Sequence, residues 1–152
     1  MTDKLDGSRK VYKDASAEEG YKKPLPKIDS INQPFYDAAQ KHELRLPKCN
    51  ACGNIFYPPS IFCPACLSED LGWPLLSGKG KVWSFIFMYQ RYFPAFADEI
   101  PYNIAFVQID EGPLLCTNLV GIANEDIKCD MPVEVFFDDA TPEVTLVKFR
   151  PV

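Results

Sequence analysis

Four cysteines in the first half of the chain have the spacing of metal ligands. Cys49 and Cys52 form one Cys-x-x-Cys pair, and Cys63 and Cys66 form a second pair after ten intervening residues. Two thiolates in a tight turn can bind one side of a metal ion, and a second pair completes a tetrahedron with Zn–S distances of about 2.3 Å. Four sulfur ligands leave no open position for water, so the spacing predicts a structural zinc site in a zinc ribbon.

Turn-forming residues accompany both cysteine pairs. Gly53 follows the first pair and Pro64 lies inside the second, and both favour turns whose backbone N–H groups point at the sulfurs. Two disulfides, or a redox-active Cys-x-x-Cys, are the alternatives. We expect no secretory signal before the cysteines, and a redox motif needs one pair, so both alternatives fit less well.

The remaining cysteines and the single histidine lack partners for chemistry. His42 has no ligand spacing to either pair, so we expect it to pack against the core or lie at its rim. Cys116 falls inside a predicted strand and is expected to be a small buried hydrophobic residue. Cys129 lies beside Asp130, and we do not expect its thiol to be reactive.

The composition is that of a folded protein with short elements. Of 152 residues, 47% are hydrophobic and 14 are prolines, which favours strands and turns over long helices. This length allows one ordinary domain, or two small ones if a metal replaces part of the smaller core. No apolar run reaches the roughly 18 residues of a membrane span, so we expect no membrane partner and a cytoplasmic location.

The chain divides into four predicted parts around the cysteines. The first mixes charges of both signs with prolines, has no apolar period, and is expected to wrap around a partner protein. A helix then begins after Asn32, with Pro34 in its first turn and one apolar face formed by residues 35, 38, 39 and 42, and it ends near Glu43. The parts are the extension 1–32, the helix and lead-in strand 33–48, the ribbon 49–76 and a β-barrel 77–152.

The last part has the alternating pattern of strands joined by turns. In the first strand Trp83, Phe85, Phe87 and Tyr89 occupy one face, while residues 82, 86 and 88 occupy the other, so we expect it to be buried on both sides. No helical run separates the strands, and closure into a five-stranded OB-fold barrel would remove exposed edges. The predicted strands are 81–91, 102–110, 114–120, 132–137 and 144–149.

Charge and motifs narrow the function classes. A zinc ribbon with an OB barrel is typical of single-strand nucleic-acid binding, but residues 49–152 hold 6 Lys and Arg against 13 Asp and Glu. Such an acidic region would repel a phosphate backbone, so nucleic acid is the lesser alternative. No Ser-His-Asp arrangement or phosphate-binding glycine loop is present in the sequence. An aromatic loop and apolar strand faces instead favour binding of another protein.

Several motifs together resemble the DUF35 family. The order is a helix at 35–44, the first cysteine pair with Gly53, the exit Tyr57-Pro58-Pro59, the second pair, Gly78-x-Gly80 and Glu111-Gly112. Members of that family are rubredoxin-like zinc ribbon plus OB-fold proteins that serve as small subunits of thiolase-like enzymes. The resemblance implies a heteromeric acyltransferase complex whose catalytic residues belong to a thiolase-fold partner. It also allows a thiolase-like retro-aldolase or an acyl-CoA hydratase as that partner.

The resemblance assigns roles to particular positions. It implies Zn²⁺ on Cys49, Cys52, Cys63 and Cys66, no catalytic residue in this chain, and an acyl-CoA thioester bound by the complex. The loop between the first two barrel strands would lie nearest the partner's cavity, and nearby cations are candidates for CoA phosphates or a substrate carboxylate, with ordinary solvated surface as the alternative. These channel candidates are Lys79, Lys81, Tyr89, Arg91, Tyr92, Phe93 and Phe96.

Overall fold

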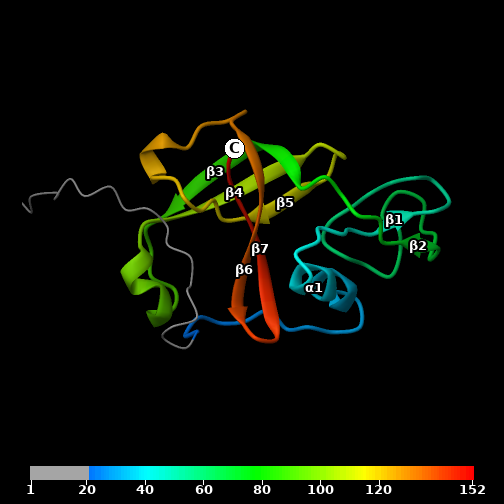
Figure 1. Cartoon of the computed structure of the whole chain (residues 1–152), viewed down its shortest axis with the longest axis horizontal. Coiled ribbons are helices and arrows are strands. Elements are labelled where there is room, and N and C mark those ends of the chain that lie inside the picture. Colours follow the sequence, from blue (N-terminus) through cyan, green and yellow to red (C-terminus); the bar gives the residue numbers. More distant parts are fainter. Residues whose placement is uncertain (1–20) are drawn as a thin grey trace, which may run out of the picture.

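The computed structural model describes residues 21–152, and the predicted extension before residue 21 lies outside the described residues. Helix α1 (Gln33–Gln40) and a small sheet of β1 (Lys48–Cys49) and β2 (Leu71–Gly72) lie at one end of a curled five-stranded sheet (Figure 1). The order of these elements along the chain is the predicted one: helix, ribbon, barrel.

Helix α1 begins as the sequence predicts. Pro34 occupies the first turn, where its missing N–H costs no hydrogen bond, and Phe35, Ala38 and Ala39 are buried on one face. Asn32 precedes the helix, but its side chain accepts a hydrogen bond from the Asp29 N–H at 2.9 Å instead of capping the helix. The helix is therefore stabilised mainly by its apolar face.

His42 lies outside the helix, which ends earlier than predicted. Its backbone has φ of 56°, a left-handed conformation that terminates the helical path. The imidazole stacks on Phe137 at 5.2 Å between ring centroids, and its Nε2 lies 3.0 Å from an Asp139 oxygen. His42 therefore joins the helix end to the edge of the barrel, in agreement with a rim position.

The five-stranded sheet consists of β3 (Lys79–Met88), β4 (Tyr102–Ile109), β5 (Leu114–Thr117), β6 (Pro132–Thr141) and β7 (Val144–Pro151). Its strands are antiparallel in the order β5-β4-β3-β6-β7. The two edges meet through a parallel bridge between Leu119 and Phe149, where the Val120 N–H donates to the Phe149 carbonyl at 2.8 Å. This closure confirms the five-stranded OB-type barrel.

The prediction that β3 is buried on both sides is wrong. A register shift between Val82 and Ser84 creates a bulge at Trp83, which is exposed. The bulge reverses the alternation, so Phe85 and Phe87 pack toward the core with Val82. The opposite face, which carries Ile86, remains open to solvent.

The prediction that Cys116 is buried is also wrong. Cys116 lies opposite Phe106 in the β4–β5 ladder, and both side chains are exposed on the outside of the barrel. The inward positions of β5 are instead taken by Leu115 and Thr117. The run Leu-Leu-Cys-Thr at residues 114–117 places one leucine on each face of the strand, so the sequence alone did not reveal which face points inward.

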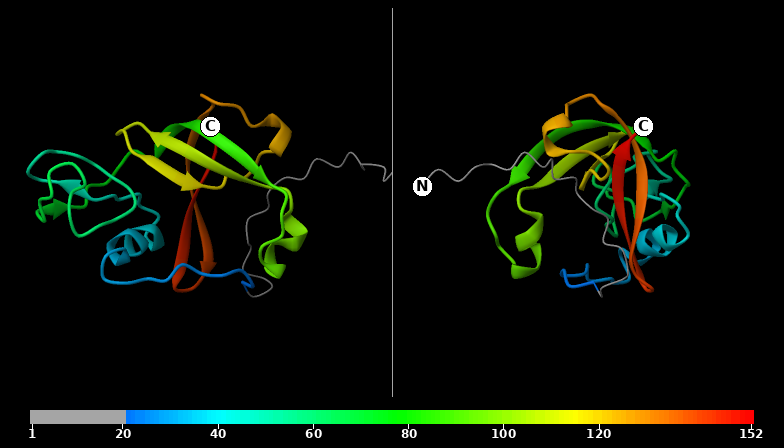
Figure 2. Two further views of the ribbon diagram at one scale, coloured as in Figure 1. Left: turned by 180° about the vertical axis from the view of Figure 1, so that it is seen from behind. Right: turned by 60° about the vertical axis from the view of Figure 1, so that its left-hand side comes forward.

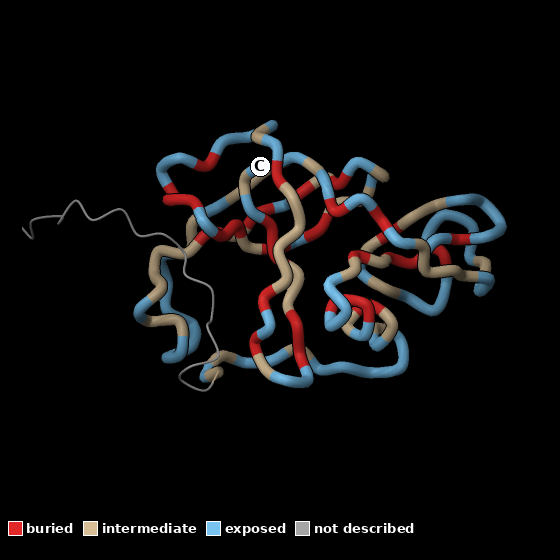
Figure 3. The backbone as a smooth tube through the Cα atoms, in the orientation of Figure 1, coloured by how far each residue is buried: buried red, intermediate tan, exposed pale blue. Residues whose placement is uncertain are grey.

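One hydrophobic core joins the helix, its lead-in strand and the barrel. Phe35, Leu44 and Leu46 pack in the same cluster as barrel residues such as Val107 and Phe149. Figure 3 shows buried stretches in α1 and along the barrel strands, whereas most of the ribbon is exposed or half-buried. The ribbon thus extends from the shared core and has a small cluster of its own.

Candidate metal centre and interaction surface

Two similar turns hold the four cysteines. In the first turn the Gly53 N–H donates to the Cys49 carbonyl at 2.8 Å, and in the second the Leu67 N–H donates to the Cys63 carbonyl at 2.9 Å. Both turns end in a left-handed residue, with φ of 78° at Gly53 and 63° at Leu67. Glycine adopts this conformation without strain and leucine does not, so the second turn requires an additional constraint to persist.

The four sulfur atoms converge at one point. All lie within 4.8 Å of one another, with Sγ–Sγ distances of 3.5 Å between Cys49 and Cys66 and 3.6 Å between Cys52 and Cys63. A tetrahedron with Zn–S bonds of about 2.3 Å has sulfur separations of about 3.8 Å. The donor set and its spacing therefore fit a zinc ion, as the sequence predicted.

Backbone donors favour the thiolate form at the centre of the cluster. Burial raises the pKa of the Cys63 thiol, but the N–H groups of Ala65 and Cys66, together with the neighbouring thiols of Cys52 and Cys66, lower this pKa to about 6. The Ala65 N–H lies 3.4 Å from the Cys63 sulfur. A thiolate is the form that binds a metal, so the turn prepares this sulfur as a ligand.

The ribbon contains little apolar material besides these cysteines. Its buried cluster consists of Cys49, Phe56 and Cys63, with Leu71 packed against it. So small a cluster cannot by itself order a loop of this length, and in small domains a metal takes over this role. We therefore assign the centre a structural role.

A largely apolar surface covers one side of the barrel, and we call it the β3–β5 outer face. In antiparallel ladders, directly opposed residues share a face. Ile86 opposes Ile104, and Phe106 opposes both Ser84 and Cys116, so these side chains form one surface. The β3–β5 outer face comprises Ser84, Ile86, Ile104, Phe106, Gln108, Leu114 and Cys116, with Lys81 opposite Gln108 at its edge.

The loop between β3 and β4 extends this apolar character. Tyr89, Tyr92 and Phe93 are all exposed, and the loop continues into the short 3-10 helix η2 (Pro94–Glu99). Phe96 in η2 is half-buried and packs on Tyr102 at 5.4 Å between ring centroids. Three of the four predicted aromatic residues of this loop are thus available to a partner.

The predicted cations do not gather at that loop. Lys79 and Lys81 lie at the start of β3 and Arg91 follows its end, so a ten-residue strand separates them by about 30 Å. Lys81 also pairs with Asp130 at 3.0 Å. Arg91 alone among these cations lies beside the aromatic loop.

Two ion pairs in the barrel were missed by the sequence reasoning. Lys148 and Asp138 pair with side chains only 4% and 3% exposed, and Lys23 pairs with Glu99 at 2.8 Å. Burial lowers the pKa of the Lys148 ammonium, while Asp138 acts in the opposite direction. A lysine inside the apolar run 144–149 was the sequence signal that could have revealed the first pair.

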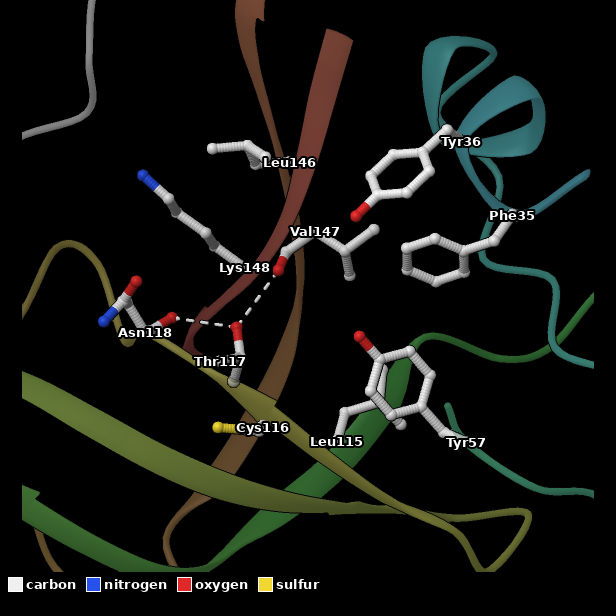
Figure 4. A pocket seen from close by; sticks show the side chains of 10 residues that line it. All are labelled: Phe35, Tyr36, Tyr57, Leu115, Cys116, Thr117, Asn118, Leu146, Val147 and Lys148. Carbon is white, nitrogen blue, oxygen red and sulfur yellow. Dashed lines mark hydrogen bonds between the residues drawn. The ribbon is translucent and has the colours of Figure 1, made fainter. Parts of the chain in front are cut away.

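A cavity of about 190 Å³ lies between helix α1, Tyr57 of the ribbon, and strands β5 and β7. Figure 4 shows the hydroxyls of Tyr36 and Tyr57 directed into this space, while the Thr117 hydroxyl donates to the Val147 carbonyl at 3.1 Å. Burial raises the pKa of both tyrosines, so they remain neutral donors. The Lys148 ammonium points away from the two rings toward Asp138.

None of the helices formed by residues 21–152 has the length and apolar character needed to span a membrane.

Two family models match adjoining stretches of the chain. Residues 37–72 match the rubredoxin-like zinc ribbon domain of ChsH2, and residues 73–138 match the C-terminal OB-fold domain of ChsH2. These matches agree with the mainly β fold and with the four-cysteine ribbon described above.

Similar proteins include subunits of enzymes that act on CoA thioesters. A probable enoyl-CoA hydratase alpha subunit of Thermomonospora curvata is 40% identical over 129 residues, which cover 85% of this chain and 40% of that protein. A DUF35 domain-containing scaffold protein of Pyrococcus furiosus is 34% identical over 74% of this chain and 86% of its own length. The benzoylsuccinyl-CoA thiolase subunit BbsA of Thauera aromatica is 27% identical, with 58% of each protein covered.

A solved structure with the same architecture supports these similarities. It is described as the Ltp2-ChsH2(DUF35) aldolase, and the matched chain superposes with a TM-score of 0.75 at 40% identity. The match covers 84% of this chain and 98% of that chain.

Proposed function

Because the chain belongs to the DUF35 family of zinc ribbon and OB-fold proteins, we propose that it is a non-catalytic subunit of a thiolase-type acyl-CoA acyltransferase complex. It would dock on a thiolase-fold catalytic subunit in the cytoplasm and help to close the channel for acyl-CoA. The catalytic residues would belong to the partner.

The observation that carries this proposal is the β3–β5 outer face together with the adjoining aromatic loop. Ile86 is 56% exposed and Phe106 is 42% exposed, and Lys81, which pairs with Asp130, lies at the edge of this face. The barrel region is acidic elsewhere, so a largely apolar surface of this kind favours burial against another protein. The loop with Tyr89, Tyr92 and Phe93 continues this surface at one end.

The comparisons support a partner that handles CoA thioesters. One matched structure is an aldolase whose name couples Ltp2 to a DUF35 chain of nearly the same extent, and BbsA is a thiolase subunit. The Thermomonospora curvata relative is a hydratase alpha subunit, but this chain spans 40% of its length. A retro-aldolase or a hydratase partner is therefore the second candidate for the complex.

In this proposal zinc has a structural role. Cys49, Cys52, Cys63 and Cys66 would hold the ion, and the ion would cross-link the two turns that lack a core of their own. The left-handed Leu67 would then be constrained by its metal-bound neighbour Cys66. The ribbon would thus become a rigid extension of the barrel.

The proposal is tested by expressing the chain alone and together with a candidate thiolase-fold protein from the same organism. The expected result is a stable hetero-oligomer that turns over acyl-CoA, whereas the isolated chain binds one zinc and shows no turnover. Turnover by the isolated chain would contradict a non-catalytic role. Failure to form any complex would contradict docking.

Within the complex, Arg91 is the cation best placed to contact CoA or a substrate carboxylate. It follows β3 beside the aromatic loop, whereas Lys79 and Lys81 lie at the far end of that strand. Replacing Arg91 with Ala should raise the KM of the complex for acyl-CoA, while Lys79→Ala serves as the matched control. An unchanged KM would place Arg91 on ordinary solvated surface.

A further inference from the structure

The β3–β4 loop is attached to the barrel by a lysine from the N-terminal segment. The side chain of Lys23 is 9% exposed and its ammonium lies 2.8 Å from an oxygen of Glu99, the last residue of η2. The same ammonium lies 5.6 Å from the ring centroid of Phe96 in η2 and 5.6 Å from that of Tyr21. One side chain therefore combines an ion pair with two cation–π contacts to the loop and the segment.

The rest of the loop has few other attachments. None of the six residues of η2 is buried, and its ring contacts are those of Phe96 with Phe93 and Tyr102. A loop with so few buried apolar contacts opens readily unless another group holds it. Within residues 21–152, Lys23 is the residue outside the loop and its flanking strands for which a charged contact with η2 is seen.

Glu99 supplies the charge that attracts Lys23 at this position. The neighbouring buried pair is formed by Lys148 and Asp138, and the Lys148 ammonium repels that of Lys23, which helps to lower the pKa of Lys148. The second oxygen of Glu99, Oε2, is buried without a hydrogen-bond partner within residues 21–152. If the Lys23 ammonium were removed, the partly buried Glu99 carboxylate would remain without its cation.

The N-terminal segment connects the β3–β4 loop with helix α1. From Lys23 the segment runs past the end of the β6–β7 hairpin to α1, as Figure 1 and both views of Figure 2 show. At its other end, the Asp29 carboxylate accepts the N–H groups of Ile31 and Asn32 in a tight turn before α1. The segment 21–32 is thus fixed at both ends, by Lys23 and by this turn.

We infer that Lys23 is a positioning residue, and that segment 21–32 is a strap which holds the β3–β4 loop in the conformation that presents Tyr89, Tyr92 and Phe93. This inference rests on the proposed function in one respect: the surface presented is the one assigned to the thiolase-fold subunit. The attachment itself concerns this chain alone. Residues 21–32 of the predicted extension therefore act first on the barrel of the same chain.

The strap is tested by hydrogen exchange of the full-length chain without any partner. Lys23→Met keeps an unbranched side chain but removes the charge, and it should increase exchange of the amides in residues 90–99 at least tenfold. Lys22→Met is the matched control, because Lys22 is the exposed neighbour in the same segment. Equal exchange in the wild type and Lys23→Met would overturn the inference.

A second variant separates loss of the strap from general unfolding. If Lys23 acts through Glu99, the double variant Lys23→Met/Glu99→Gln should increase hydrogen exchange of the loop amides no more than Lys23→Met alone does. The amides of β4 should keep their protection. Additive effects, or loss of protection throughout β4, would contradict a local attachment. Both outcomes can be read from the same exchange experiment.

Affinity for the thiolase-fold protein then tests the link to function. Lys23→Met should weaken binding at least tenfold, with Lys22→Met unchanged. Faster loop exchange with unchanged affinity would keep the strap but remove the loop from the docking surface, and so contradict that part of the proposed function. Unchanged exchange would refute the strap whatever the affinity.

Discussion

A charge placed on the β3–β5 outer face should prevent docking while leaving the fold intact. Ile86 is 56% exposed on this face, and its Cα partner across the ladder is Ile104, so Ile86→Asp adds a carboxylate without creating a cavity in the core. Full burial of an isoleucine side chain stabilises by about 1.5–3 kcal/mol, so the exposed half accounts for about 1–1.5 kcal/mol. An unpaired carboxylate buried in the complex costs at least about 2 kcal/mol more.

Together these effects predict that Ile86→Asp weakens binding to the thiolase-fold subunit by about 3 kcal/mol, or roughly a hundredfold in Kd. Isothermal titration calorimetry with the purified partner measures this change, and near-UV circular dichroism checks that the fold is retained. Ile61→Asp is the matched control, because Ile61 is 55% exposed and lies on the ribbon. If Ile61→Asp weakens binding and Ile86→Asp does not, the docking surface is the ribbon and the assignment of the β3–β5 outer face is refuted.

Three further predictions concern the isolated chain. Cys63→Ser should reduce the zinc measured by elemental analysis to well below one ion per chain. In hydrogen exchange the ribbon amides should lose protection while the barrel amides stay protected. Full zinc occupancy would contradict the assignment of Cys63 as a ligand. Lys148→Met leaves Asp138 buried without its cation and should lower the free energy of unfolding in urea by about 3–5 kcal/mol. The double variant Lys148→Met/Asp138→Leu should recover most of this loss. A double variant no more stable than Lys148→Met would contradict the pairing. The Thr145 hydroxyl, with help from His42, lowers the pKa of Asp139, so the ionised carboxylate stabilises the hairpin at pH values above the usual carboxyl range, and this stabilisation is lost as the pH falls through the lowered pKa. Thr145→Val should raise the pKa of Asp139 in an NMR titration. An unchanged pKa would contradict this cause.

The sequence predicted the features that depend on local chemistry. The two cysteine pairs, each with its own turn, bring their sulfurs together as predicted. The second barrel strand, by contrast, was expected to be buried on both sides like the first, but Phe106 on its outer side is exposed. Gly53 could be identified as a turn residue from its type alone. Leu67 could not, because nothing about leucine signals the left-handed conformation that it adopts.

The features that the sequence did not predict depend on contacts between distant segments. The bulge at Trp83 arises from the pairing of β3 with β4, and it reverses an alternation that reads as regular in the sequence. The Lys23–Glu99 pair joins residues 76 positions apart, so no local pattern reports it. The separation of Lys81 from Arg91, by contrast, already follows from the strand predicted over residues 81–91.

The central claim is that this zinc-bound chain functions while attached to a larger catalyst. Native mass spectrometry of the untagged protein, isolated gently from the cells that produce it, tests this claim most directly. The account predicts a hetero-oligomer in which each copy of this chain carries one zinc ion and is accompanied by a thiolase-fold polypeptide. A metal-free monomer as the sole species would contradict it.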